Sequence, residues 1–158
     1  MRSDMNSADT KSAAKTLTVV NPFDLSPIDT LAENSAADAE NALATAYALF
    51  RDRKGWLPVH ERLAILERTV ALMEQRTGRL IETAVREGGK PIADTSAEIA
   101  RAIDSVKSAI AALRTDAGEV VPMNLTPATV RRMAFTQREP VGVVVAVSAF
   151  NHPLNLIV

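Results

Sequence analysis

The sequence predicts an α/β fold in which helices cover a sheet that is incomplete. Apolar residues recur at helical spacing through much of residues 35–116, whereas residues 141–147 are apolar at successive positions. A strand with two apolar faces is typical of the centre of a parallel sheet covered by helices. Parallel neighbours need crossover connections, and the sequence ends at Val158 without a later strand to supply them. We therefore expect a truncated or split polypeptide.

The N-terminal part predicts a tail followed by a hairpin. Residues 1–15 are small and polar without periodicity, so we expect a disordered tail there. Residues 16–20 are rich in β-formers, and residues 28–31 can pair back onto them across a turn. This hairpin opens the first structural unit, which we place at residues 16–118.

Three helices are predicted after the hairpin. The first begins near Ser35, because Asp38 stands three residues later at the spacing of a capping box. Its apolar residues predict one buried face, formed by Ala39, Leu43, Ala46, Tyr47 and Phe50. Pro58 suits the first turn of the second helix, whose apolar face comprises Val59, Leu63, Leu66, Val70 and Met73. The third, over residues 79–87, should end at Gly88-Gly89, where glycine can adopt a left-handed conformation.

A fourth and longest helix is predicted over residues 93–116, with Gly118 beyond its end. Thr95 is its candidate cap, with Glu98 three residues later. The apolar stripe lasts only about two heptads, short of the three or four that a coiled coil needs, so packing within the protein is expected. The stripe comprises Ile99, Ile103, Val106, Ile110 and Leu113.

Charged residues in this region predict no binding site. Lys90 follows two glycines, but the spacing of a phosphate-binding loop is absent and Pro91 removes a backbone donor, so a structural turn is expected. Arg131 and Arg132 could contact an anionic substrate or a neighbouring subunit. Adjacent strand residues point to opposite faces, however, so solvated strand charges are expected rather than a joint anion clamp. Carboxylates of the helices are expected in weak surface ion pairs: Glu61, Glu67, Glu74 and Glu82.

The C-terminal part predicts a second hairpin and a ligand-binding turn. Residues 119–138 are β-capable on both sides of Pro127, as in an antiparallel hairpin. Residues 139–158 contain the apolar strand, a turn and the start of another helix. Open α/β sheets bind ligands at the carboxyl ends of their strands, where Asn151 lies. Its amide could stabilise an oxyanion or cap the helix, and physical reasoning alone favours the cap.

Composition excludes several functional classes. The 18 basic and 19 acidic side chains give a net charge of −1, which argues against a nucleic-acid partner. No stretch reaches the roughly 20 apolar residues of a membrane span, and the first fifteen residues lack an apolar signal core, so a cytoplasmic location is expected. The sequence contains two histidines and no cysteine, so neither a metal site nor a thiol nucleophile is expected in this chain.

Four segments in the same order resemble the NAD(P)-dependent aldehyde dehydrogenase superfamily. Residues 139–154, EPVGVVVAVSAFNHPL, look like the "EPVGVV…PWNFPL" segment of that family. The other segments are Asn21-Pro22, the helix from Trp56 to Leu66, and the Glu87 to Pro91 turn, similar to "E-x-GKP". The resemblance spans about residues 16–158 and identifies the chain as the N-terminal portion of such an enzyme.

The resemblance implies an aldehyde dehydrogenase-like fold with an incomplete Rossmann-like cofactor domain. It implies oxidation of a small aldehyde to an acid by NAD or NADP through a cysteine thiohemiacetal. Asn151 matches the asparagine that stabilises the oxyanion, and Val147, Ser148, Ala149 and Phe150 match the turn beside the nicotinamide and ribose. Residues 119–138 fall where the family builds an intersubunit sheet, which implies a homo-oligomer of the full-length enzyme.

Two departures from the family pattern limit this expectation. The chain has no cysteine, so we expect it to be inactive alone. His152 stands where the family most often has Phe, which could reflect a polar aldehyde, although a histidine without a catalytic role is the favoured interpretation. The alternative function is a non-catalytic helical module, in which the stripe of residues 99–113 binds a partner helix, or the remnant of a truncated gene.

Overall fold

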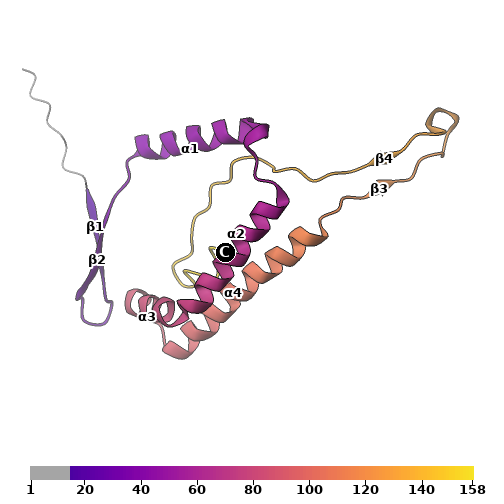
Figure 1. Cartoon of the computed structure of the whole chain (residues 1–158). Coiled ribbons are helices and arrows are strands. Elements are labelled where there is room, and N and C mark those ends of the chain that lie inside the picture. The colour runs from indigo at the N-terminus through magenta and orange to yellow at the C-terminus, as the bar shows by residue number, and fades with distance from the viewer. Residues whose placement is uncertain (1–14) are drawn as a thin grey trace, which may run out of the picture.

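The computed structural model describes residues 15–158, so the predicted tail lies almost entirely outside the described residues (Figure 1). Within this part of the chain there are four α-helices and two two-stranded antiparallel sheets. The helices are α1 (Ala36–Arg51), α2 (Val59–Gln75), α3 (Thr77–Gly88) and α4 (Ile92–Thr115). The strands are β1 (Thr16–Val20), β2 (Pro27–Ala32), β3 (Val120–Val121) and β4 (Ala134–Phe135). Two short 3-10 helices, η1 (Arg53–Gly55) and η2 (Pro127–Thr129), lie between them.

The predicted N-terminal hairpin is confirmed. Strands β1 and β2 pair with Thr16 opposite Ala32 and Val19 opposite Asp29. The register shifts between Val19 and Val20, next to the turn. The hairpin is continued by a hydrogen bond from the Glu33 N–H to the Lys15 carbonyl oxygen at 2.8 Å.

Helix α1 has the predicted start but not the predicted buried face. The Ser35 hydroxyl oxygen accepts the Asp38 N–H at 3.2 Å, and the Asp38 carboxylate accepts the Ser35 N–H at 2.7 Å. No residue of α1 is buried, and Leu43 and Tyr47 remain about half exposed. The prediction of a buried face is wrong here because α1 packs mainly against η1, where Trp56 stacks on Phe50, rather than against α2 to α4.

We expect Ser35→Ala to unfold the start of α1 without affecting the rest of the protein. Loss of an N-cap costs about 1 kcal/mol of helix stability, and α1 contributes no residue to the core. Backbone chemical shifts should show lower helicity in α1 and unchanged shifts in α4. The control is Ser108→Ala, an exposed serine inside α4. Unchanged helicity at residues 36–40 in Ser35→Ala would contradict the importance of this cap.

The core lies between α2 and α4, which run side by side with α3 packed across one end (Figure 1). Its buried members are Val70, Met73, Ile99, Ala102, Ile103 and Val106. The stripe on α4 is therefore packed within the protein, as predicted, and Ile110 joins it at the edge. Two exposed ion pairs connect the same helices, Glu67 with Arg114 and Glu74 with Lys107, as expected for these glutamates.

The turn between α3 and α4 depends on Gly89 and Pro91. Gly89 has the predicted left-handed conformation, with φ of 65°, and a Cβ there would lie 2.7 Å from a ring carbon of Pro22. Helix α4 begins directly after Pro91, so the predicted cap at Thr95 is wrong. Because Thr95 lies inside the helix, its hydroxyl instead donates to the Pro91 carbonyl oxygen at 3.0 Å.

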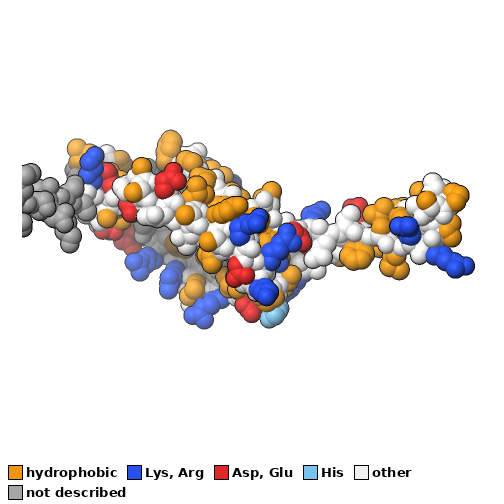
Figure 2. All heavy atoms as spheres, turned by 90° about the horizontal axis from the view of Figure 1, so that it is seen from above, with side chains coloured by type: hydrophobic (Ala, Val, Ile, Leu, Met, Phe, Trp, Pro, Cys, Tyr) orange, Lys and Arg blue, Asp and Glu red, His pale blue; other side chains and the backbone are white. Residues whose placement is uncertain are grey.

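The second hairpin is confirmed, and its outer part is apolar and exposed. Val120 pairs with Phe135, and Val121 pairs with Ala134. Figure 2 shows hydrophobic side chains gathered at this end of the molecule. Among them, Leu125, Met133 and Phe135 are at least 71% exposed. Arg131 and Arg132 are both exposed, as expected of solvated charges, but they lie in the connection before β4 rather than in a strand.

The predicted central strand is not formed. Residues 139–149 are without strand or helix, and Val141 and Val147 are more than nine-tenths exposed. A strand needs a neighbour to pair its backbone groups, and no described segment pairs with this one. Residues 153–157 form turns rather than the predicted helix, with a single i to i+4 bond from the Leu156 N–H to the His152 oxygen. No described helix combines the length and apolar character of a membrane span.

Candidate functional site

The extended segment after β4 returns to the start of α4, and this return creates a groove (Figure 1). The groove has a volume of about 670 Å³. Its lining includes Phe150, Asn151 and His152 from this segment, together with Lys90 and Arg101. Of the residues that the sequence assigned to a site, the structure brings Phe150 and Asn151 to this groove. It leaves Val147, Ser148 and Ala149 outside the lining.

A buried ion pair lies at the base of this region. Glu98 has no exposed surface, although it is a carboxylate on α4. Lys90, in the turn before α4, places its ammonium nitrogen 2.5 Å from Glu98 Oε2, and its side chain is 18% exposed. We call these two residues the anchor pair.

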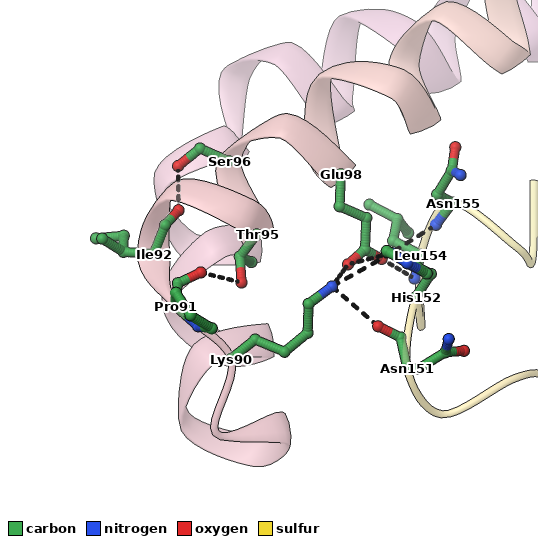
Figure 3. Close-up of polar contacts among 10 residues, drawn as sticks. All are labelled: Lys90, Pro91, Ile92, Thr95, Ser96, Glu98, Asn151, His152, Leu154 and Asn155. Atoms are coloured by element: carbon green, nitrogen blue, oxygen red, sulfur yellow. Dashed lines mark hydrogen bonds and ion pairs between the residues drawn. The ribbon is translucent and has the colours of Figure 1, made fainter.

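The anchor pair holds the segment that carries Asn151 (Figure 3). Lys90 Nζ donates to the main-chain carbonyl oxygen of Asn151 at 2.9 Å. Glu98 Oε1 accepts the backbone N–H groups of Leu154 at 3.0 Å and of Asn155 at 3.4 Å. One buried pair therefore makes three hydrogen bonds to the backbone of a segment more than fifty residues later in the chain.

Asn151 does not have the capping role that its residue type favours. The Leu154 N–H, three residues later, is bonded to Glu98, and no described hydrogen bond involves the Asn151 side chain. Figure 3 shows this side-chain amide directed away from Lys90. The residue is exposed on the groove. Its amide can thus form hydrogen bonds with a molecule bound at this surface.

His152 lies beside the anchor pair. Its Nδ1 is 3.3 Å from Lys90 Nζ and 3.5 Å from Glu98 Oε2, and its ring is partly exposed. A neutral imidazole with an unprotonated Nδ1 would accept from the ammonium group. The described polar contacts of the His152 ring are therefore with the anchor pair.

Sequence reasoning missed the anchor pair because it assigned Glu98 to a cap and Lys90 to a turn without a partner. Helical periodicity contained a signal for Glu98. Thr95, three residues before it, and Ala102, four residues after it, share its face, and all three side chains are fully buried. A carboxylate on the core face of a helix needs a cationic partner. Periodicity could not identify Lys90 as this partner, because Lys90 lies in the turn before the helix.

A comparison with protein families identifies the chain. The model of the aldehyde dehydrogenase family matches residues 9–158. The chain belongs to the aldehyde dehydrogenase family. The resemblance inferred from four segments of the sequence is thereby confirmed.

Individual proteins similar to the chain agree with this assignment. The 4-(hydroxymethyl)benzenesulfonate dehydrogenase TsaD1 of Comamonas testosteroni is 36% identical over 140 residues, which are 89% of this chain and 28% of that enzyme. Aldehyde dehydrogenase 21 of Physcomitrella patens, solved with its reaction product succinate, superposes with a TM-score of 0.84 at 28% identity, covering 92% of this chain and 30% of that one. The glyceraldehyde-3-phosphate dehydrogenase GapN of Methanocaldococcus jannaschii, solved with NADP, gives 0.80 at 31% identity, with the same coverage.

The chain spans less than a third of the length of the aldehyde dehydrogenases it matches. The shared part is 27% to 30% of the curated relatives, whereas it is about nine-tenths of this chain. The prediction of an aldehyde dehydrogenase-like fold is therefore confirmed for the portion, about 30% of the full fold, that the chain covers. The sheet of the cofactor domain is not formed by the described residues.

Electrostatics support a charged Glu98 in this aldehyde dehydrogenase segment. Burial alone would raise the pKa of its carboxyl group. The hydrogen bonds from Lys90 Nζ and from the N–H groups of Leu154 and Asn155 outweigh this effect and hold the pKa below its ordinary value of 4.5. The carboxylate thus remains ionised at neutral pH.

This lowered pKa predicts a pH dependence of stability. A carboxyl group with a lower pKa in the folded state stabilises the fold above its unfolded pKa, and that stabilisation is lost as the pH falls through the folded pKa. The Tm of the wild-type chain should therefore fall as the pH decreases below 4.5. Glu98→Gln should have a lower Tm at pH 7 and a weaker acid dependence.

The control is Glu74→Gln, which removes an exposed carboxylate of a surface pair on α2. Its Tm should follow the wild-type acid dependence closely. Thermal unfolding followed by circular dichroism from pH 3 to pH 7 measures all three proteins. Parallel curves for wild type and Glu98→Gln would contradict the assignment of a lowered pKa to Glu98.

Proposed function

We propose that this chain provides the N-terminal part of an enzyme that oxidises an aldehyde to an acid with NAD or NADP, in which Asn151 stabilises the oxyanion. The observation that supports it most directly is the exposed side-chain amide of Asn151, which points away from Lys90 while its main-chain carbonyl is held by the anchor pair. Family membership supports the class of reaction. Solved structures that match the chain contain NADP or NAD+.

The chemistry places a specific demand on Asn151. When a thiolate adds to an aldehyde carbon, the carbonyl oxygen becomes negatively charged. A dinucleotide held beside residues 147–150 would supply the hydride acceptor for that carbon. A fixed amide N–H close to this oxygen stabilises the charge without reorganising at the moment of reaction. Asn151 provides a neutral donor of this kind, on a segment anchored to the core helix α4.

The turn before Asn151 fits the proposed cofactor contact. The side chains of Val147 and Phe150 are more than nine-tenths exposed, so they offer apolar surface against which a flat ring could pack. Ser148 and Ala149 between them complete the proposed contact beside nicotinamide and ribose. The cysteine nucleophile would come from outside residues 1–158, which contain no cysteine. We propose that residues 119–138 form the intersubunit hairpin of a homo-oligomer.

The alternative function, a helical interaction module, needs an exposed apolar surface on α4. A helical interaction module would use the stripe on α4 to bind a partner helix. Ile99, Ile103 and Val106 of that stripe are buried against α2 instead. No other described feature favours this alternative over an enzyme segment.

Mass spectrometry and an activity assay on the protein purified from its source test the proposed function. A mass well above 17.0 kDa, or a second polypeptide copurifying with the chain, should accompany aldehyde-dependent formation of NADH or NADPH at 340 nm. A panel of aliphatic, aromatic and carboxylated aldehydes covers the substrate classes. The 158-residue chain alone should be inactive. Activity of that chain alone would overturn the cysteine mechanism, and an inactive longer protein would overturn the proposed activity.

A further inference from the structure

The anchor pair is unlike the other ion pairs of the described chain. The pairs Glu67 with Arg114 and Glu74 with Lys107 join helix surfaces, and each of their side chains is at least half exposed. Glu98 is fully buried, and both members of the anchor pair bond to a backbone outside their own elements. A charge is costly to bury, so this arrangement calls for a role beyond the weak stabilisation of a surface pair.

We propose that Lys90 and Glu98 are positioning residues that set the location and orientation of Asn151. This inference rests on the proposed oxyanion role of Asn151. Lys90 acts at the main-chain carbonyl of that residue, and Glu98 acts at the N–H groups of Leu154 and Asn155. Neither residue contacts a reacting atom in this proposal, so both act through the backbone of residues 151–155.

The geometry of the three backbone bonds explains how the segment is fixed. A cation binds a carbonyl oxygen at one end of the segment, and a carboxylate binds two N–H groups at the other end. Since the two side chains are also bonded to each other, sliding or rotation of the segment would lengthen at least one of these bonds. With its carbonyl fixed, Asn151 has its Cα to Cβ bond restrained as well, and the amide is directed away from the pair (Figure 3).

The anchor pair is itself held by the core. Glu98 lies between Thr95 and Ala102 on the buried face of α4, next to Ile99. Leu154 also packs against the core cluster, so the segment is held by apolar contact as well as by charge. Charge-assisted hydrogen bonds in a buried setting are stronger than exposed ones between neutral groups. The position of Asn151 is thereby tied to the helix that supplies most of the core.

The test separates positioning from the cost of a lone buried charge. The double variant Lys90→Met/Glu98→Gln leaves no unpaired charge. The new glutamine can still accept the N–H groups of Leu154 and Asn155 through its amide oxygen. The Asn151 carbonyl, in contrast, loses the ammonium group that donates to it. In the longest natural protein that contains this chain, we expect kcat to fall by about tenfold or more, with KM for NAD(P) changed by less than about twofold. Lys90→Arg, which retains a cationic donor, should recover most of kcat.

The matched control is Lys107→Met/Glu74→Gln, which makes the same two substitutions in an exposed pair. It should leave kcat unchanged. A folded Lys90→Met/Glu98→Gln variant with wild-type kcat, alongside an Asn151→Ala variant that is impaired, would overturn the positioning role. An inactive wild-type protein would overturn the proposed function instead. In that case a second measurement, which does not need activity, tests whether the anchor pair positions Asn151.

That measurement is made on the 158-residue chain by NMR. The double variant should shift the side-chain amide resonances of Asn151 and increase hydrogen exchange at the Leu154 and Asn155 N–H groups. The control double variant should leave these signals unchanged. Identical Asn151 resonances in wild type and Lys90→Met/Glu98→Gln would overturn the positioning role independently of activity.

Discussion

Asn151→Ala is expected to lower kcat by about 10² to 10³, the usual effect of removing one donor from a site that stabilises an oxyanion. The side-chain amide is exposed and has no described internal partner, so its removal should cost the fold little. The affinity for NAD(P) should change little, because the interaction develops only as the carbonyl oxygen becomes charged. The test is to measure kcat and the dissociation constant of NAD(P) for both proteins, in the longest natural protein that contains the chain. The variant should change kcat and leave the dissociation constant nearly unchanged.

Asn155→Ala is the control for this substitution. Asn155 lies four residues later, and its described bond to Glu98 comes from the backbone N–H, which alanine retains. Its kcat should therefore remain near wild type. Asn151→Asp adds a second comparison, since it keeps the shape of the side chain but replaces the donor with a negative charge, and it should be at least as impaired as Asn151→Ala. An unchanged kcat in Asn151→Ala would refute the oxyanion role.

Local patterns in the sequence predicted the elements well, because caps and helical spacing act over a few residues. Ser35 with Asp38 predicted the start of α1, and Gly89 predicted the end of α3. The stripe on α4 predicted its buried face. These features depend on neighbouring residues, which a sequence contains explicitly.

Features that depend on distant partners were not predicted. Leu43 and Tyr47 of α1 have the spacing of a buried face, but no described element covers them. Residues 141–147 have the composition of a central strand, yet no described strand pairs with them. Asn151 was selected by its place in the family motif, whereas the partners of its backbone lie more than fifty residues earlier in the chain.

Lys90→Met is expected to destabilise the chain by about 3–5 kcal/mol at pH 7, the cost of leaving a buried charge without its partner. Glu98 would retain the N–H groups of Leu154 and Asn155 but lose the only Lys or Arg side chain that is bonded to it in the described chain. Urea unfolding followed by circular dichroism measures the change. Lys107→Met is the control, because it removes a lysine from an exposed pair, and its effect should be much smaller.

The pH dependence of Lys90→Met distinguishes a lost charge interaction from lost packing of the lysine stem. Without the cation, burial raises the pKa of the Glu98 carboxyl, and such a group destabilises the fold while it is ionised. Acidification below the unfolded pKa protonates it in both states, so the difference from the parent protein should shrink as the pH falls from 7 to 4. Both proteins carry His152→Phe in this comparison, because that imidazole lies 3.5 Å from Glu98 Oε2 and would otherwise be a second side chain in contact with this carboxylate. A packing defect would lower the stability at pH 7 and at pH 4 alike. An equal decrease in the free energy of unfolding at the two pH values would therefore refute the ionic role of Lys90.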